Sequence, residues 1–247
     1  MNILSKVNTF NDLSDFARDI LGESLDHQET VKRVAIFPGA YKPPHRGHYH
    51  TAATAAKHTD SLYIIISNSP REAVSGEVAR DIWQVYQKYI EMEAPGVNIE
   101  VKMLDYAASP VAITYQLANI LNNRQFVPGD KISDKEPLPG ISDIGDEILQ
   151  RYDSSNIELI PVAGKGDGGR YRGLMRGEKY SGENVTNIDI LEVERLTSAS
   201  SVRAAILSVA NNEGDISTIR QNLPDVLTPE DEERVINILT GIHHDQG

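Results

Sequence analysis

The chain has 247 residues, 36 of them acidic and 24 basic, and a formal net charge of -12. General nucleic-acid binders need a basic surface to displace counterions, so this charge argues against that class, although a basic pocket for one small phosphorylated ligand is compatible with it. The chain has no cysteine, no apolar run as long as a membrane helix, and no apolar signal-peptide core near its start. We therefore expect a cytoplasmic protein without disulfides and without nucleic-acid or membrane partners.

Residues 1–30 precede the first expected strand. Apolar side chains recur there at helical spacing and a glycine stands where the helix would end, at Leu13, Phe16, Ala17, Ile20, Leu21 and Gly22. We expect a helical leader followed by a polar linker. This leader could be an accessory to the fold, an oligomer contact or a docking segment, and the sequence does not decide between them. A homo-oligomer is therefore one of the expected alternatives.

The apolar run Val34–Phe37 predicts a buried strand, which one glycine and three prolines bring to an end. The alanine-rich stretch that follows predicts a helix with His45 and His48 near its first turn. Gly47 between them lets a ligand approach the backbone. Two imidazoles, Lys42 and free backbone N–H groups would then converge on one spot, which suits an anion such as a phosphate.

Two other interpretations of His45 and His48 stay open. They could belong to a metal site, although the chain has no cysteine and the nearby His50 and His58 do not complete a recognisable ligand set. They could also be exposed polar residues without a ligand.

The remaining elements alternate between strands and helices. Strands are predicted at residues 62–66, 97–103, 157–162 and 188–193. Helices are predicted at 77–92 and 110–122, after the segment 195–203 as far as about residue 211, and from 229 onward. This order predicts an α/β fold, a Rossmann-like doubly wound parallel sheet with helices on both faces, plus a C-terminal helix. We expect Trp83 to pack in the core or at an interface.

Residues 123–156 form the least regular region, rich in proline and glycine, with only a short helix predicted near 146–152. We interpret this insertion as a variable surface loop, with a lid or an oligomer contact as the alternatives. The predicted domains are therefore a helical leader and linker at 1–30, a core at 31–214 and a helical tail at 215–247.

Two further segments after strands carry polar or flexible residues. The glycine-dense loop 164–170, whose basic residues are Lys165 and Arg170, predicts either contact with a nucleotide or a plain flexible turn, since its spacing fits neither the Rossmann nor the Walker pattern. The hydroxyl cluster 197–201 would cap a helix, or it would form a phosphate cradle together with Arg203.

Residues 39–48, Gly-Ala-Tyr-Lys-Pro-Pro-His-Arg-Gly-His, resemble the signature loop of the HxGH nucleotidyltransferase superfamily. That superfamily includes the nicotinamide mononucleotide adenylyltransferases, the phosphopantetheine adenylyltransferases and the cytidylyltransferases. Its members usually have a small hydroxyl residue in place of Ala40 and an aspartate in place of Lys42. Residues 197–203 resemble the second signature, Ile-Ser-Ser-Thr-x-x-Arg, and depart from it at Thr197, Ala199 and Ser200.

The resemblance covers about residues 31–210 and implies that 31–214 form a nucleotidyltransferase domain. It implies that a substrate phosphate attacks the α-phosphate of a nucleoside triphosphate and that pyrophosphate leaves. The expected pair is ATP, as the donor of AMP, and a phosphorylated small molecule such as nicotinamide mononucleotide. A Mg²⁺ ion would bridge the phosphates, with no metal ligand from the protein.

The implied catalytic residues are His45, His48, Lys42 and Arg203. The expected nucleotide contacts are Gly39, Ala40, Tyr41, Gly47, Gly164, Asp167, Ser198, Ser200 and Ser201. Basic residues in the region of Arg71 and Arg80 often approach the substrate phosphate in related adenylyltransferases, with a solvated surface arginine as the alternative for each.

Three rival functions stay open at this point. A non-catalytic nucleotide-binding or structural protein on the same fold would explain the altered motif positions. A cytidylyltransferase would use CTP in place of ATP. A relative of the class I aminoacyl-tRNA synthetases would share a histidine-rich loop, but the acidic charge, the small size and the lack of a lysine-rich second signature argue against it.

Overall fold

The structure, a computed structural model, describes residues 31–68, 74–122, 139–152, 156–174, 185–194, 199–211 and 213–241. The predicted leader and linker at 1–30 lie outside the described residues. From Lys32 onward the described residues belong to one unit. The predicted division of this part at residue 214 stays a prediction.

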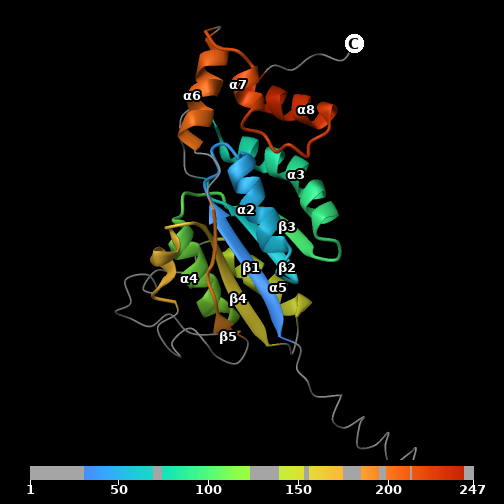
Figure 1. Cartoon of the computed structure of the whole chain (residues 1–247). Coiled ribbons are helices and arrows are strands. Elements are labelled where there is room, and N and C mark those ends of the chain that lie inside the picture. The colour runs from blue at the N-terminus through green and yellow to red at the C-terminus, as the bar shows by residue number, and fades with distance from the viewer. Residues whose placement is uncertain are drawn as a thin grey trace, which may run out of the picture. The chain divides into compact units, whose positions relative to one another are not determined.

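Among the described residues, six strands, all parallel, form the sheet (Figure 1). They are β1 (Lys32–Gly39), β2 (Ser61–Ile66), β3 (Asn98–Met103), β4 (Ile157–Gly164), β5 (Val185–Ile188) and β6 (Leu191–Val193). The order is β3-β2-β1-β4-β5, with β6 also paired to β4. From β1 the chain adds strands first on one side, β2 and β3, and then on the other, β4 and β5. This reversal of the strand order confirms the predicted Rossmann-like arrangement, in which ligands bind at the carboxyl edge of the sheet where the order reverses.

The last predicted strand, 188–193, is wrong in its bounds. The structure has two short strands there, β5 and β6, which pair with the first and the second half of β4. Asp189 interrupts them, because its carboxylate accepts a hydrogen bond from the backbone N–H of Ile190 at 2.8 Å. A side chain that bonds the backbone of the next residue in this way competes with a strand ladder.

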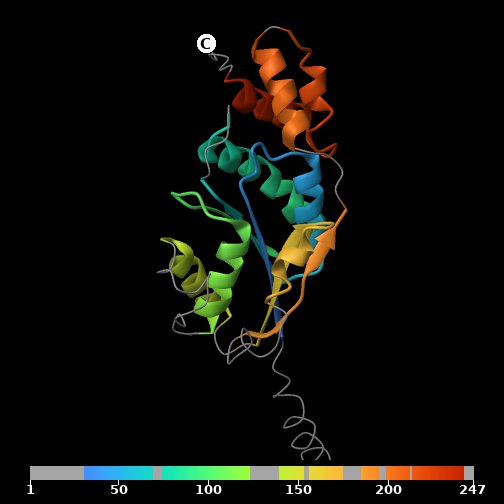
Figure 2. The same cartoon turned by 90° about the vertical axis from the view of Figure 1, so that its left-hand side faces the viewer.

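Helices cover both faces of the sheet, as predicted. One core holds residues of α2 (Arg46–Ala56), α3 (Gly76–Glu93), α6 (Ala199–Ala210), α7 (Ser217–Arg220) and α8 (Pro229–Thr240), and the other holds residues of α4 (Pro110–Leu121) and α5 (Ile141–Arg151). Successive side chains of β1 point to opposite faces of the sheet, so Ala35 and Phe37 lie in the first core and Val34 and Ile36 in the second. Figure 2 shows α4 and α5 on one side of β1 and α2 on the other.

Helix α5 corrects the interpretation of residues 123–156 as a variable surface loop. The helix begins at Ile141, five residues before the predicted start, and its buried face packs on α4. A Cβ on Gly145 would lie 2.5 Å from Cγ2 of Ile120, so the two helices approach closely at this glycine. The described part of the insertion is therefore a core element, while residues 123–138 lie outside the described residues.

The C-terminal helix α8 begins and packs as its sequence predicts. Thr228 caps it, Pro229 takes its first position, and Val235 and Leu239 are buried against the core. Its carboxylate Asp231 accepts a hydrogen bond from the hydroxyl of Tyr89 on α3 at 2.5 Å. Among the described residues, no helix has the length and apolar character needed to cross a membrane.

Candidate active site

Two adjoining cavities open at the carboxyl edge of the sheet. The β4 cavity, of about 320 Å³, is lined by Phe37–Tyr41, His45, Gly47, His48, Thr51, Pro110, Val162–Gly164, Asp167, Arg170 and Tyr171. The α4 cavity, of about 530 Å³, is lined by Ala40–Lys42, His48, Ala107–Pro110, Arg170 and Arg203. The two share Ala40, Tyr41, His48, Pro110 and Arg170, so they lie side by side.

The two histidines of the first motif lie together, as predicted. His45 caps α2, and its Nδ1 accepts a hydrogen bond from the backbone N–H of Gly47 at 3.1 Å. The ring of His48 stacks on it, with 3.8 Å between ring centroids. Because Nδ1 of His45 is an acceptor, its neutral ring carries the proton on Nε2.

Burial lowers the pKa of His45 from 6.5 to about 4. The residue is only 3% exposed, and a buried site disfavours the charged form. His45 is therefore a neutral hydrogen-bond donor at pH 7, not a cation.

The expectation of free backbone N–H groups at this loop is wrong for two of them. The N–H of Arg46 donates to the carbonyl of Asn222 at 2.8 Å, and that of Gly47 donates to His45. The guanidinium of Arg46 also donates to the carbonyl of Gln221, at 3.3 Å. The segment after α7 thus holds the start of α2, and the side chains of the loop carry most of its capacity to bind an anion.

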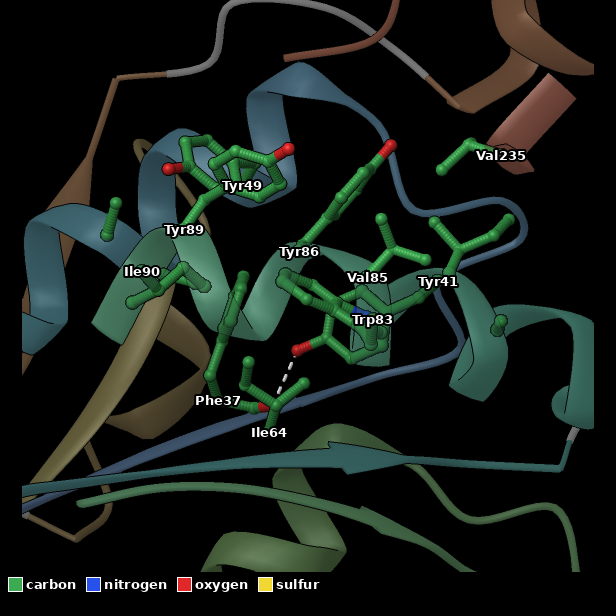
Figure 3. Close-up of a cluster of buried hydrophobic side chains, with 14 of the residues drawn as sticks. Phe37, Tyr41, Tyr49, Ile64, Trp83, Val85, Tyr86, Tyr89, Ile90 and Val235 are labelled. Atoms are coloured by element: carbon green, nitrogen blue, oxygen red, sulfur yellow. Dashed lines mark hydrogen bonds between the residues drawn. The ribbon is translucent and has the colours of Figure 1, made fainter. Parts of the chain in front are cut away.

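Tyr41 forms the support beneath His48. Its ring meets the ring of His48 edge to face, with 5.1 Å between centroids. It also meets the ring of Trp83 at 5.2 Å, and its hydroxyl donates to the carbonyl of Phe37 (Figure 3). The backbone of Tyr41 has a positive φ of 47°, which is uncommon for a residue with a side chain and costs free energy. A Cβ on Gly39 would lie 2.8 Å from this ring, so the position leaves no room for a side chain.

The two motifs meet at Lys42. Nη1 of Arg203 on α6 donates to the carbonyl oxygen of Lys42 at 2.8 Å, although the two residues are 161 positions apart. Both line the α4 cavity, and the Lys42 side chain is buried, with 2% of the residue exposed. Together with Arg170 they make the lining of the described α4 cavity strongly positive.

The glycine-dense loop after β4 lines the other side. Gly164 and Asp167 face the β4 cavity, and Arg170, which lines both cavities, pairs with Asp167 at 3.2 Å. The N–H of Gly168 donates to the Glu192 carboxylate at 2.7 Å, which ties the loop to β6. This placement agrees with the predicted nucleotide contact for Gly164 and Asp167, which stays a prediction.

Several predicted residues do not join the cavities. Ser200 and Ser201 are exposed on α6 and line neither of the two. Arg80 pairs with its neighbour Asp81 at 2.8 Å and also lines neither. Ser198 and Arg71 lie outside the described residues, so their predicted roles are untested.

Sequence reasoning missed the start of α4. Ala107 and Ala108 line the α4 cavity, and Ser109 caps the helix there. The sequence predicts this helix from residue 110, and the helix follows a parallel strand whose carboxyl end lies at the same edge as the histidine loop. That shared edge was the signal that could have placed it in the site.

No group of three or more His, Asp or Glu that could hold a metal ion occurs among the residues described. Asp167 is the one carboxylate among the described residues that line the two cavities. Mg²⁺ prefers several oxygen ligands, so this lining fits an ion that arrives on phosphate oxygens better than one held by the protein.

The lowered pKa of His45 predicts how stability depends on pH. The unfolded chain protonates this histidine below pH 6.5, whereas the folded chain keeps it neutral down to about pH 4. The free energy of unfolding should therefore fall as pH drops through this window, by about 3 kcal/mol in total for this group. Urea unfolding of the parent and of His45→Asn between pH 7 and 4 measures it, and a constant difference between the two would contradict the prediction.

Residues 36–94 match the cytidylyltransferase-like family. The resemblance to the HxGH nucleotidyltransferase superfamily is thereby confirmed over this segment. A curated relative, the phosphopantetheine adenylyltransferase of Aquifex aeolicus, is 31% identical over 74 residues, which are 30% of this chain and 43% of that protein. The chain thus spans less than half the length of this relative.

Solved structures of two adenylyltransferases are also similar to the chain. The nicotinic acid mononucleotide adenylyltransferase of Plasmodium falciparum, complexed with APC, shows 12% identity and a TM-score of 0.47, over 83% of this chain and 95% of that one. A bifunctional NMN adenylyltransferase/ADP ribose pyrophosphatase of Francisella tularensis shows 13% identity and a TM-score of 0.43, over 85% of this chain and 52% of that one.

Proposed function

We propose that the protein is a nucleotidyltransferase that transfers AMP from ATP to a phosphorylated small molecule, such as nicotinamide mononucleotide, and releases pyrophosphate. The observation that carries the proposal is the stacked pair His45 and His48 at the junction of two cavities, one of which has three cations in its lining. The curated relative is an adenylyltransferase, and this favours AMP over CMP as the transferred group.

The two cavities suit different parts of the donor. Apart from the two histidines and Arg170, the β4 cavity is lined mainly by backbone and apolar groups with one carboxylate, Asp167, so it suits a nucleoside. The α4 cavity has Lys42, Arg170 and Arg203 in its lining, so it suits phosphates. The α-phosphate would then lie where the cavities meet, beside His48.

The chemistry needs no covalent intermediate. An oxygen of the acceptor phosphate attacks the α-phosphorus as the bond to the β-phosphate oxygen breaks, and pyrophosphate leaves in line. The acceptor oxygen is already deprotonated at pH 7, so the step needs no general base. The protein positions the two phosphates and stabilises the charge that develops on their oxygens.

Each residue has a distinct task in this scheme. Nε2–H of His45, fixed by the bond from Gly47 to Nδ1, donates to a phosphate oxygen without changing its own charge. His48 donates beside it, and Lys42 and Arg203 hold the phosphates that depart. A Mg²⁺ ion bound with the triphosphate would supply further positive charge.

The test is pyrophosphate release in the presence of Mg²⁺, with ATP or CTP paired against phosphorylated acceptors that include nicotinamide mononucleotide and phosphopantetheine. We expect release with ATP and one acceptor and little with CTP. Release with CTP alone would make the protein a cytidylyltransferase. If no pair released pyrophosphate while ATP still raised the melting temperature, the result would favour a nucleotide-binding protein without turnover.

A further inference from the structure

Arg170 occupies the point where the β4 cavity and the α4 cavity adjoin. The other residues that line both are Ala40, Tyr41, His48 and Pro110. Among these five, Arg170 is the one with a permanent positive charge at pH 7. In the proposed reaction, this junction is the place of the phosphorus under attack.

We infer that Arg170 is a further catalytic residue, which exchanges its ion pair with Asp167 for the reacting α-phosphate. The inference rests on the proposed function. It adds a residue that neither signature motif contains, and it assigns to the glycine-dense loop a part in the chemical step in addition to nucleotide contact.

The ion pair that Arg170 would give up is weak. The Arg170 side chain is 64% exposed, and Nη2 lies 3.2 Å from Oδ1 of Asp167. Exposed pairs of this kind contribute little to stability, while a guanidinium binds phosphate oxygens with two parallel hydrogen bonds. Exchange of the carboxylate for a phosphate is therefore favourable once the nucleotide is bound.

The other two cations of the α4 cavity are held more firmly. Lys42 is buried in the loop, and Arg203 donates to the Lys42 carbonyl at 2.8 Å. Arg170 has a long exposed side chain on a short turn whose next residue, Tyr171, is buried. Its base is anchored and its charged end is exposed, so the guanidinium can turn from Asp167 to the phosphate.

Arg170 takes no part in the bonds that form and break in this step. A bond forms between the acceptor oxygen and the α-phosphorus, and the bond from that phosphorus to the leaving pyrophosphate breaks. The guanidinium keeps all its protons and donates hydrogen bonds to the non-bridging oxygens, where negative charge accumulates in the transition state.

Lys165 supplies a matched control from the same loop. Its ammonium pairs with Glu194 at 2.8 Å, it is about as exposed as Arg170, and it lines neither cavity. Loss of either basic side chain breaks one exposed ion pair, but only the loss of Arg170 removes a charge from the junction.

The experiment measures pyrophosphate release at saturating substrates for Arg170→Ala, Arg170→Lys and Lys165→Ala, with circular dichroism to verify folding. We expect kcat to fall about 100-fold in Arg170→Ala, with the KM for ATP changed less than about threefold. Arg170→Lys should recover part of the loss, because an ammonium restores charge but not paired hydrogen bonds. Lys165→Ala should stay within about twofold of the parent.

The outcomes separate this inference from the proposed function. An active parent whose Arg170→Ala variant keeps its kcat would overturn the role of Arg170 alone. A variant with unchanged kcat and a KM raised about tenfold or more would make Arg170 a binding residue and also overturn the catalytic role. A parent that releases no pyrophosphate with any acceptor would overturn the proposed function and this inference together.

Discussion

Replacement of His45 by alanine should lower kcat for pyrophosphate release by about two to three orders of magnitude, and His48→Ala should do the same. The loss of one donor that is aimed at a developing phosphate charge typically has this size. The two rings stack at 3.8 Å and work on one phosphate, so the double variant should lose less than the product of the two single losses.

His50 gives the matched control for this prediction. It lies two residues after His48 on the same helix but is exposed, and it lines neither cavity. His50→Ala should keep the activity of the parent within about twofold. If His45→Ala released pyrophosphate as fast as the parent while it bound ATP, the catalytic role assigned to His45 would be overturned, although the parent's own activity would still support the proposed function.

The strands and helices were largely predictable because burial dictates their residues. The apolar runs Val34–Phe37 of β1 and Leu62–Ile66 of β2 admit few other structures, since strands buried on both faces are nearly continuous hydrophobic runs. The Ser-Pro and Thr-Pro starts of α4 and α8 combine a cap with a proline at the first position, and each predicts the first residue of its helix.

The parts that were mispredicted depend on contacts between distant residues. Helix α5 begins earlier than its local sequence indicates because Ile141 and Ile144 pack in the core with α4, and no local pattern shows that. Likewise, the bond from Arg46 to Asn222 joins the first motif to a segment 176 positions later, which no local signal shows.

The candidate site was predictable where a motif carries the geometry. The pairing of His45 with His48 follows from their spacing at a helix start, and the meeting of Lys42 with Arg203 follows from two motifs at one sheet edge. The junction position of Arg170 was not predictable, since it depends on how the loop after β4 folds over that edge.

Trp83→Ala should have the largest effect on stability, a loss of about 3–5 kcal/mol in the free energy of unfolding. The indole is fully buried on α3, and its ring meets those of Phe37, Tyr41 and Tyr86 edge to face. Deletion of so large a side chain removes all these contacts at once. Urea unfolding measures the change, and Met92→Ala, at a 75% exposed position of the same helix, should change stability by less than about 0.5 kcal/mol.

Trp83→Phe separates the loss of volume from the loss of the aromatic contacts. Nε1 of Trp83 has no hydrogen-bond partner among the described residues, so phenylalanine removes an unsatisfied donor while it keeps an aromatic ring. We expect a loss within about 1.5 kcal/mol. A loss as large as that of Trp83→Ala would contradict the packing argument.

Trp83 should also affect the chemistry, because the aromatic cluster connects it to the site. Trp83 packs on Tyr41 (Figure 3). Tyr41 in turn supports the ring of His48. At a temperature where Trp83→Ala remains folded, its kcat should therefore fall while that of Trp83→Phe stays near the parent. A folded Trp83→Ala protein with the kcat of the parent would mean that Tyr41 keeps its strained conformation without this support.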